Sequence, residues 1–356
     1  MELAAHLGSP VDESQALGAL ATVLDGRSLL RENLAVTQER LALRRAPNFE
    51  IHESIEALRS AAAAHLYVGE YPAALEKLEQ SAELAQRAQV VEQQVNAYGL
   101  IAQCYYRLDR WDDVLAAEAR WRELERRFPR ERVGETCFYV ALSAGVYALR
   151  GERQRAQDYA RESMDYMVSV SGGPERWQRN QFYCSSLPLA AQGEYALLRA
   201  RLETALGKQG QPVRRGTMAH DHHVYMLLTE AAAQQRDAAG LAQYLPGLLA
   251  VAERDDHRLY LGVAARAQGV AARLAGDHLA AAHHFTQAHD LFAALDTRWQ
   301  LARTLVERAE LAQAAGDPAA ARDLYTHALD LFAALHATPD FERTRAALAR
   351  LDSGTA

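Results

Sequence analysis

The sequence predicts an all-α fold in which about eight helix pairs stack side by side into a solenoid. The hexapeptide Asp-Leu-Phe-Ala-Ala-Leu occurs at residues 290–295 and again at 330–335, a spacing of 40 residues. Turn signals recur at intervals of 40 to 43 residues, and the segments between them are rich in Ala, Leu, Glu, Gln and Arg, which favour helices. Runs of alternating β-branched residues are nearly absent. A fixed period of this length is typical of stacked helical repeats.

Each repeat unit is expected to contain a helix, a short turn, a second helix and a connector. The turns are placed at Gly26, Gly69, Asp109, Gly151, Gly193, Arg236, Gly276 and Gly316. The units then span residues 12–48, 49–90, 91–130, 131–174, 175–214, 215–256, 257–296 and 297–338, followed by a capping helix at 339–352. Because such units stack in one continuous row, we interpret residues 1–356 as a single superhelical domain. The two ends resemble single repeat helices, which suggests a segment of a larger protein.

Two recurring side-chain positions support these boundaries. Seven residues before each turn stands a small side chain: Ala19, Ala62, Ala102, Ala144, Ser186, Thr229, Gly269 and Ala309. A small residue on the first helix lets the second helix approach closely. After the turn, a large apolar residue is expected to bury against the neighbouring helix; this position holds Leu78, Leu202, Leu245, Phe285 and Tyr325.

Two prolines interrupt this regularity. Pro188 falls inside the first helix of the fifth unit, and Pro246 inside the second helix of the sixth. A proline in a helix interior removes a hydrogen bond and usually kinks the axis. The most loop-like connectors, at 169–174 and 207–216, flank the same region. Two interpretations stay open: a bend that shapes a pocket within residues 180–230, or repeat drift without a role.

Composition excludes several classes of function. A formal net charge of −7 argues against a nucleic-acid surface along the whole chain. The longest uncharged run, at 238–252, is shorter than the roughly 20 residues that a membrane-spanning helix needs. The three widely spaced cysteines, Cys104, Cys137 and Cys184, fit buried free thiols in a reducing compartment. We therefore predict a cytoplasmic protein that by itself binds neither nucleic acid nor a membrane.

The sequence also lacks the motifs of catalysis and of cofactor binding. No phosphate loop, nucleophile elbow, zinc-protease motif or dinucleotide fingerprint is found, so we expect no enzyme activity and no cofactor. One cluster, His220-Asp221-His222-His223, places His220 and His223 on one helix face, as in some metal sites. Zinc needs three or four protein ligands, and no partner cluster is evident, so we predict no metal site.

The unit pattern resembles the tetratricopeptide repeat (TPR). The match is strongest in the last two units, in which the signature positions hold Gly269, Gly276, Ala281, Phe285 and Ala288, and then Ala309, Gly316, Ala321, Tyr325 and Ala328. The resemblance implies a right-handed α-α superhelix whose first helices line the concave face. The long units are similar to the sensor arrays of bacterial STAND-type signalling ATPases and their regulatory relatives, including the maltose-operon activator. In that family the array is a sensing or assembly module.

In this register, positions 13, 10, 6 and 3 before each turn share one helix face and form the expected inner wall. Candidate partner-binding residues on this wall are Arg59, Asn96, Gln103, Tyr106, Phe138, Asn180, Tyr183, His223, Met226, Glu230, Arg266 and Arg273. The same stripe continues to Arg303 and Glu310. Amides can bond a peptide backbone, tyrosine offers rigid contact area, and arginine grips carboxylates. No lysine lies on the wall, so it does not reproduce the lysine carboxylate clamp of chaperone-binding TPR proteins.

These features favour a non-enzymatic scaffold that binds a protein or peptide on its concave face. A second hypothesis is a small-molecule effector receptor with its pocket at the fifth and sixth units, with Tyr183, Trp177 and His223 as contacts. A third is a structural array that self-associates. A closed cavity would favour the receptor, whereas an open channel would favour the scaffold.

Overall fold

The computed structural model describes residues 9–128, 136–170, 186–206 and 221–353. Throughout these residues the chain is helical, and they contain no β-strand, so the all-α prediction is confirmed. The helices are α2 (Pro10–Gly26), α3 (Leu30–Ala42), the short 3₁₀ helix η1 (Leu43–Arg45), α4 (Ile51–Tyr67), α5 (Tyr71–Arg87), α6 (Val91–Arg107), α7 (Trp111–Arg127), α8 (Thr136–Leu149), α9 (Arg153–Val170), α11 (Tyr195–Leu206), α12 (Asp221–Gln234), α13 (Ala238–Arg254), α14 (Arg258–Leu274), α15 (His278–Ala294), α16 (Arg298–Ala314), α17 (Pro318–Ala334) and α18 (Thr338–Ser353). Residues 186–192 are also helical and precede α11.

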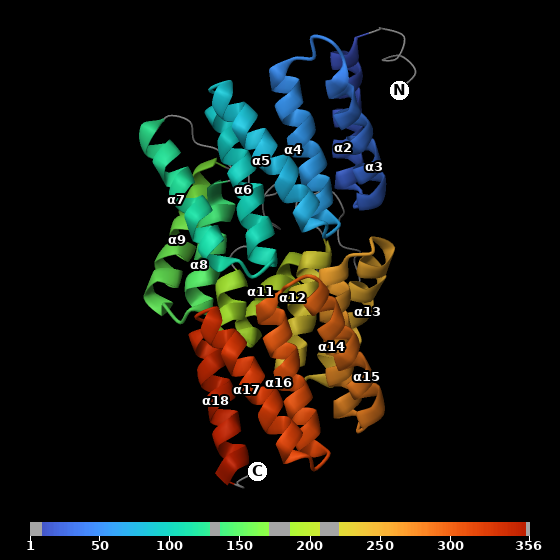
Figure 1. Ribbon diagram of the computed structural model, residues 1–356, viewed down its shortest axis with the longest axis vertical. Coiled ribbons are helices and arrows are strands. Elements are labelled where there is room, and N and C mark those ends of the chain that lie inside the picture. The colour runs from blue at the N-terminus through green and yellow to red at the C-terminus, as the bar shows by residue number, and fades with distance from the viewer. Residues whose placement is uncertain (1–8, 129–135, 171–185, 207–220, 354–356) are drawn as a thin grey trace.

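Consecutive helices pack as hairpins, and each hairpin packs on the next. The helices α4 and α5, α6 and α7, α8 and α9, α12 and α13, α14 and α15, and α16 and α17 form such pairs (Figure 1). The last helix, α18, packs on α17 as an unpaired first helix, which confirms the predicted capping helix. The stack is therefore the predicted helical-repeat superhelix.

The hairpin turns depend on one residue in the left-handed region. In the seventh hairpin Gly276 has φ of 80°, its N–H bonds the Arg273 carbonyl at 3.0 Å, and the Asp277 N–H bonds the Ala272 carbonyl at 2.9 Å. This is the Schellman pattern that ends many helices. Seven of the eight predicted turn residues have positive φ. The first turn differs, because Gly26 is still helical and Ser28, with φ of 54°, makes the turn.

The column of small side chains marks the closest helix approach within each hairpin. A methyl group added at Gly269 would lie 2.5 Å from the ring of Phe285, so α14 and α15 pack too closely there for any larger residue. Ala62, Ala102, Ala144 and Ala309 have no exposed surface at the equivalent positions. The stripe behind the turns is buried as predicted at Leu78, Leu202, Phe285 and Tyr325, whereas Leu245 is only partly buried.

The prolines do not break the described helices. Helix α13 continues from Ala238 to Arg254 through Pro246, so the predicted interruption is absent there. Pro188 lies within the helical residues 186–192. The connectors at 171–174 and 207–216 fall outside the described residues.

The superhelix consists of two halves that are stacked end to end and contact each other. Helices α2–α9 occupy the upper half of Figure 1 and α11–α18 the lower half, with the chain ends at opposite poles. Three hairpin tips of the upper half contact the starts of three lower helices: Gly69 meets His257, Asp109 meets Trp299, and Gly151 meets Thr338. These partners are 188, 190 and 187 residues apart, so the same contact recurs after about four to five units.

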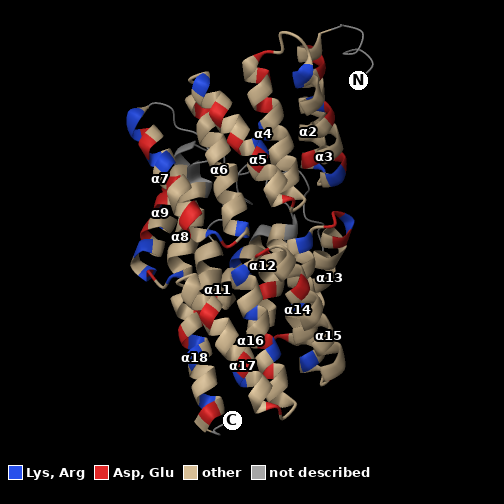
Figure 2. Cartoon of the chain, viewed as in Figure 1, with Lys and Arg blue, Asp and Glu red and all other residues tan. Residues whose placement is uncertain are grey.

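We call this boundary the seam. Arg31 adds a further bond across it, from its Nε to the Asp255 carbonyl at 2.7 Å. The Trp111 and Trp299 rings meet edge to face with centroids 6.3 Å apart. Acidic and basic residues are interspersed along the helices of both halves in Figure 2. None of the described helices is long and apolar enough to cross a membrane.

Candidate functional site

A cavity of about 70 Å³ lies at the centre of the molecule, where the seam meets the inner helices of the lower half. Its lining is mainly apolar and aromatic, and it is contributed by hairpins from both halves: Tyr106, Trp111, Leu149, Leu187, Ala190, Tyr195, Met226, Leu259, Val263 and Trp299. Cavities of this composition, with a few polar groups, are typical ligand sites.

Asp109 is one of the polar groups of the cavity and also joins the halves. It occupies the left-handed turn position between α6 and α7, with φ of 57°. One of its carboxylate oxygens accepts hydrogen bonds from the backbone N–H groups of Trp299, at 2.8 Å, and Gln300, at 3.3 Å. Burial raises the pKa of Asp109 to about 7, although these N–H groups act in the opposite direction.

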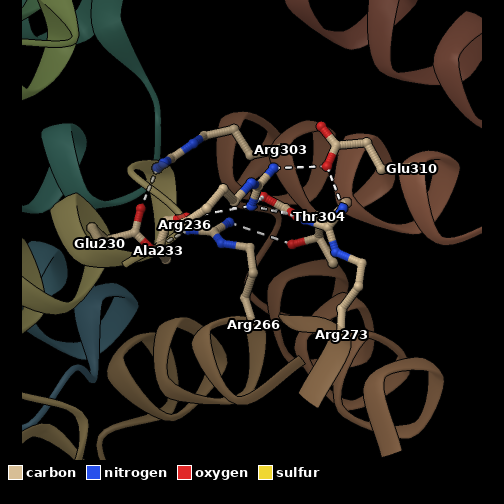
Figure 3. Close-up of polar contacts among 9 residues, drawn as sticks. Glu230, Ala233, Arg236, Arg266, Arg273, Arg303, Thr304 and Glu310 are labelled. Atoms are coloured by element: carbon tan, nitrogen blue, oxygen red, sulfur yellow. Dashed lines mark hydrogen bonds and ion pairs between the residues drawn. The ribbon is translucent and has the colours of Figure 1, made fainter. Parts of the chain in front are cut away.

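A second polar cluster consists of Glu230 on α12, Arg266 on α14 and Arg303 on α16. Glu230 accepts from Arg266 at 2.7 Å and also from Arg303 (Figure 3). Arg266 is 2% exposed and additionally donates to the Gln300 carbonyl and side chain. Burial by itself raises the pKa of Glu230, but the two guanidinium groups outweigh it, so this pKa lies below its usual value. Glu230 is therefore a buried anion shared by two cations.

The next cluster along the inner face pairs two arginines with two glutamates. Arg236 and Arg273 each contact both Glu307 and Glu310, at 2.6 to 2.9 Å. Glu307 is 4% exposed, and its pKa is raised because burial and the neighbouring Glu310 outweigh the two arginines. Figure 3 shows Arg236, Arg273 and Glu310 beside the Glu230 cluster. The two clusters form a continuous charged layer between α12, α14 and α16.

A groove of about 330 Å³ opens over this layer, between α16 and α18. Its floor includes Val306, Phe332 and Ala347. Its charged lining comprises Arg236, Arg303, Glu307, Glu310, Asp340, Arg343 and Arg350. Arg343, which is 55% exposed at its side chain, pairs with Asp340 at 2.6 Å. The groove thus combines a narrow apolar floor with charged walls.

The predicted wall residues fall into different environments. Tyr106, Met226 and Glu230 line the central cavity, and Arg273 belongs to the charged layer. His223 contacts the Tyr260 hydroxyl and, at 3.1 Å, the Arg107 guanidinium across the seam.

Six predicted wall residues lie away from the cavity or outside the described side chains. Arg59 pairs with Glu56 on its own helix, and Asn96 and Gln103 are half-buried on α6. The Phe138 side chain, Asn180 and Tyr183 lie outside the described residues. Their partner-binding roles stay predictions.

One expectation needs correction. The wall was expected to be an open surface, but Arg266 and Glu230 are buried, and their polar groups bond each other. The physical reason is that both side chains lie between neighbouring hairpins of the lower half, where Arg266 contacts Glu230 on α12 and Gln300 and Thr304 on α16. These two residues therefore stabilise the buried charged layer and do not form an open binding surface.

Sequence reasoning missed the seam contribution to the site. Trp111, Trp299 and Gln300 lie outside the inner-wall stripe, and their contacts with Asp109 and with each other join segments about 190 residues apart. The only available signal was Asp109 itself, a turn residue with an ionisable side chain where most of the turns carry glycine.

The histidine cluster gives no metal site in the part of the chain that the structure describes. Among those residues no group of three potential ligands converges. His220 lies outside them, and His223 is engaged with Tyr260. Cys104 is a buried free thiol, as predicted, and burial raises its pKa far above the usual range.

Comparison with known proteins supports the fold. No protein-family model matches the chain, and no curated protein matches it. Among solved structures, the "Crystal Structure of Rap Protein Complexed with Competence and Sporulation Factor" is similar, with a TM-score of 0.56 and 12% sequence identity. The match covers 97% of this chain and 99% of the Rap protein chain. The chain thus has a TPR-like helical-repeat fold over nearly its whole length.

Proposed function

We propose that this chain is a non-enzymatic helical-repeat scaffold that binds a peptide or an extended protein segment in the groove between α16 and α18. The groove itself is the main observation in support. It lies on the inner face of the lower half, and Arg343 and Arg350 on its wall are exposed. An extended chain can place its backbone along such a groove and its side chains against the alternating charged and apolar lining.

The electrostatics favour an acidic partner. The groove-lining residues, together with the ion-pair network they belong to, contain six arginines: Arg236, Arg266, Arg273, Arg303, Arg343 and Arg350. The same described set contains only four carboxylates: Glu230, Glu307, Glu310 and Asp340. The inner face is thus net positive in a chain whose net charge is −7. Such local complementarity increases association rates and specificity.

The structural neighbour adds support of a general kind. The Rap protein with a similar fold is described as complexed with Competence and Sporulation Factor, so a superhelix of this kind can hold a binding partner. By extension, we place this chain in the cytoplasm as the sensing or assembly module of a bacterial regulator, of which the STAND-type proteins are one model. Ligand contact across several units would bias such a module between two states.

Affinity selection of a synthetic decapeptide pool with free termini, read by mass spectrometry, tests the proposal. Selected peptides are then measured by fluorescence anisotropy against the Arg343→Glu/Arg350→Glu variant. We expect at least a tenfold loss of affinity, because two groove cations become anions. The matched control is Arg322→Glu/Arg345→Glu, which makes the same charge change at side chains that are 50% and 64% exposed and do not line the groove. Failure to select any peptide, or equal losses in both variants, would contradict the proposal.

A small-molecule receptor is the second candidate, and the central cavity favours it. Leu187, Tyr195 and Met226 of the fifth and sixth units line the cavity. It also draws on α7, α14 and α16. A ligand that binds the cavity without any peptide attached would support the receptor over the scaffold.

A further inference from the structure

Arg303 lies between the central cavity and the groove. Among the described residues it alone lines both the central cavity and the groove. It lies one helical turn after Trp299 on α16, with its guanidinium carbon 4.5 Å from the centroid of the Trp299 ring. A ligand group at Arg303 would therefore have an apolar chamber on one side and the open groove on the other.

The hydrogen-bonding capacity of Arg303 is not used up. A guanidinium group carries five N–H donors. Arg303 is 9% exposed, and its one bond to a described residue goes to Glu230. Arg266, which is more deeply buried at 2% exposure, donates to Glu230, to Gln300 and to Thr304. A buried guanidinium with unused N–H donors is well suited to bind a carboxylate, because it can donate two parallel hydrogen bonds to the two carboxylate oxygens.

The charged side chains around the cavity carry a net positive charge that one anion would neutralise. Arg107, Arg266 and Arg303 face Asp109 and Glu230, a formal excess of one positive charge. Glu230 is shared by Arg266 and Arg303, and the Asp109 carboxylate is held by two backbone N–H groups. Asp340, nearby in the groove, is paired with Arg343. One incoming carboxylate would bring this group to neutrality.

The size of the cavity limits what can enter it. Its volume of about 70 Å³ is about half of the ~150 Å³ of an engineered cavity that holds benzene. The lining residues Met226, Leu259 and Val263 offer apolar contacts. An aliphatic group of the size of a valine or leucine side chain fits such a space better than an indole ring does.

We propose that Arg303 and the cavity form a subsite for an aliphatic group that carries a carboxylate, supplied by the C-terminal residue of the bound peptide. The free carboxylate accepts from Arg303, the aliphatic side chain enters the cavity, and the preceding residues follow the groove toward Arg350. This inference rests on the proposed scaffold function. The groove that leads away from Arg303 favours a peptide over a free acid, because it gives the rest of the chain a path.

The test uses N-acetylated pentapeptides of the form Ala-Ala-Ala-Ala-X, as free acids and as amides, with X as Leu, Val, Ala or Trp, measured by isothermal titration calorimetry. We expect the Leu and Val acids to bind about 10- to 100-fold more tightly than their amides, because the amide loses a charged hydrogen bond. The Ala and Trp acids should bind more weakly than the Leu acid. In Arg303→Gln the preference for acid over amide should disappear.

Three further variants serve as controls for this test. Arg273→Gln removes an arginine from the neighbouring ion-pair cluster and does not line the cavity, so it should keep the preference for the acid. Should Arg303→Gln not fold, Arg303→Lys keeps the charge but loses the fork, and we expect a partial loss of the preference. Ala190→Met fills the cavity and should abolish the advantage of Leu over Ala while leaving the preference for the acid.

The outcomes separate this inference from the scaffold function. Groove-dependent binding with equal affinity for acid and amide would overturn the subsite and leave the scaffold standing. Binding of N-acetyl-leucine alone, as tight as that of the pentapeptide, would support the subsite chemistry but replace the peptide with a small acid. Absence of binding by every pentapeptide and by N-acetyl-leucine would overturn the subsite, and the decapeptide selection would then decide the scaffold function independently.

Discussion

Asp109 shows how one residue can serve two distant elements. Helices α13, α15 and α17 are each capped at the N-terminus by the side chain of their own aspartate: Asp237, Asp277 and Asp317. Helix α16 has Thr297 at this position, and that side chain makes no capping bond. Asp109 supplies the missing cap across the seam by accepting from the N–H groups of Trp299 and Gln300. The cap therefore depends on closure of the superhelix.

Asp109 should give the protein a distinctive pH dependence. Its pKa is about 7 in the folded chain, above the ~3.9 of an unfolded aspartate. Between these values the folded state binds more protons, so the contribution of Asp109 to the free energy of unfolding falls as pH rises from about 4 to 7. Asp109→Asn keeps an acceptor and should remove this contribution. Chemical denaturation at pH 5 and pH 8 measures the difference.

Asp109→Ala separates the charge from the cap. It should lower the free energy of unfolding by about 1–2 kcal/mol at pH 5, because no acceptor remains for α16. The loss should be smaller at pH 8, because the ionised Asp109 carboxylate already lowers the stability of the wild-type protein there. Asp317→Asn makes the same substitution at a local and more exposed cap and is the control. An unchanged pH profile in Asp109→Asn would contradict the assignment.

The buried anion Glu230 yields a second prediction at this scale. Glu230→Leu would leave Arg266 and Arg303 without their shared partner in the protein interior. We expect a loss of about 3–5 kcal/mol in the free energy of unfolding, since an unpaired buried charge is costly. Glu56→Leu breaks the more exposed pair with Arg59 and should cost no more than about 1 kcal/mol. Thermal and chemical denaturation of both variants provides the comparison.

At the scale of the element, the hairpin is held by a small residue facing a large one. Gly269 on α14 lets the Phe285 ring of α15 reach the helix backbone, and this ring has no exposed surface. Gly262 plays the same role for Phe292 about two turns further along the pair, where an added methyl would lie 2.7 Å from the ring. The helix crossing is thus set by two aromatic rings seated on two glycines.

Gly269→Ala should destabilise the α14–α15 hairpin by about 1–3 kcal/mol, because the new methyl group overlaps the Phe285 ring. Phe285→Leu removes the ring edge and opens a space of its own. The double variant should therefore lose less stability than the sum of the two single variants. Additive losses in chemical denaturation would show that the two residues do not meet as the structure places them.

At the scale of the whole molecule, the seam decides the shape. A repeat array is elastic because each unit contacts mainly its neighbours. Here the contacts of Arg31 with Asp255, of Asp109 with Trp299 and of Gly151 with Thr338 join one turn of the superhelix to the next. These contacts hold the two halves of the superhelix together around the central cavity.

Cutting the seam should therefore open the molecule while each half keeps its helices. We expect the variant Arg31→Ala/Asp109→Ala/Trp299→Ala to show a larger radius of gyration in small-angle X-ray scattering, with unchanged helix content in circular dichroism. Arg122→Ala/Arg199→Ala removes ion pairs between neighbouring helices within each half and serves as the control. An unchanged scattering curve in the seam variant would show that the closure does not depend on these contacts.

Local sequence patterns are enough to predict the helices, the hairpins and most of the turns. The 40-residue period, the small column ending in Ala309 and the large stripe ending in Tyr325 are local patterns, and the contacts that they encode lie within one unit or between adjacent units. The first turn was misplaced by two residues because Gly26 was taken as its centre, whereas Ser28 adopts the left-handed conformation. Tyr106, Met226 and Glu230 of the inner-wall stripe line one cavity in the structure.

The residues that meet across the seam, and the wall side chains that stay open, become apparent in the three-dimensional fold. The small rotation between neighbouring units accumulates along the array, and that sum determines that Asp109 meets the start of α16. No local pattern encodes such a sum, so the sequence pattern could not predict the cavity or the cap that Asp109 supplies to α16. Contacts between neighbouring helices specify the repeat units, whereas contacts across the seam form the candidate binding site.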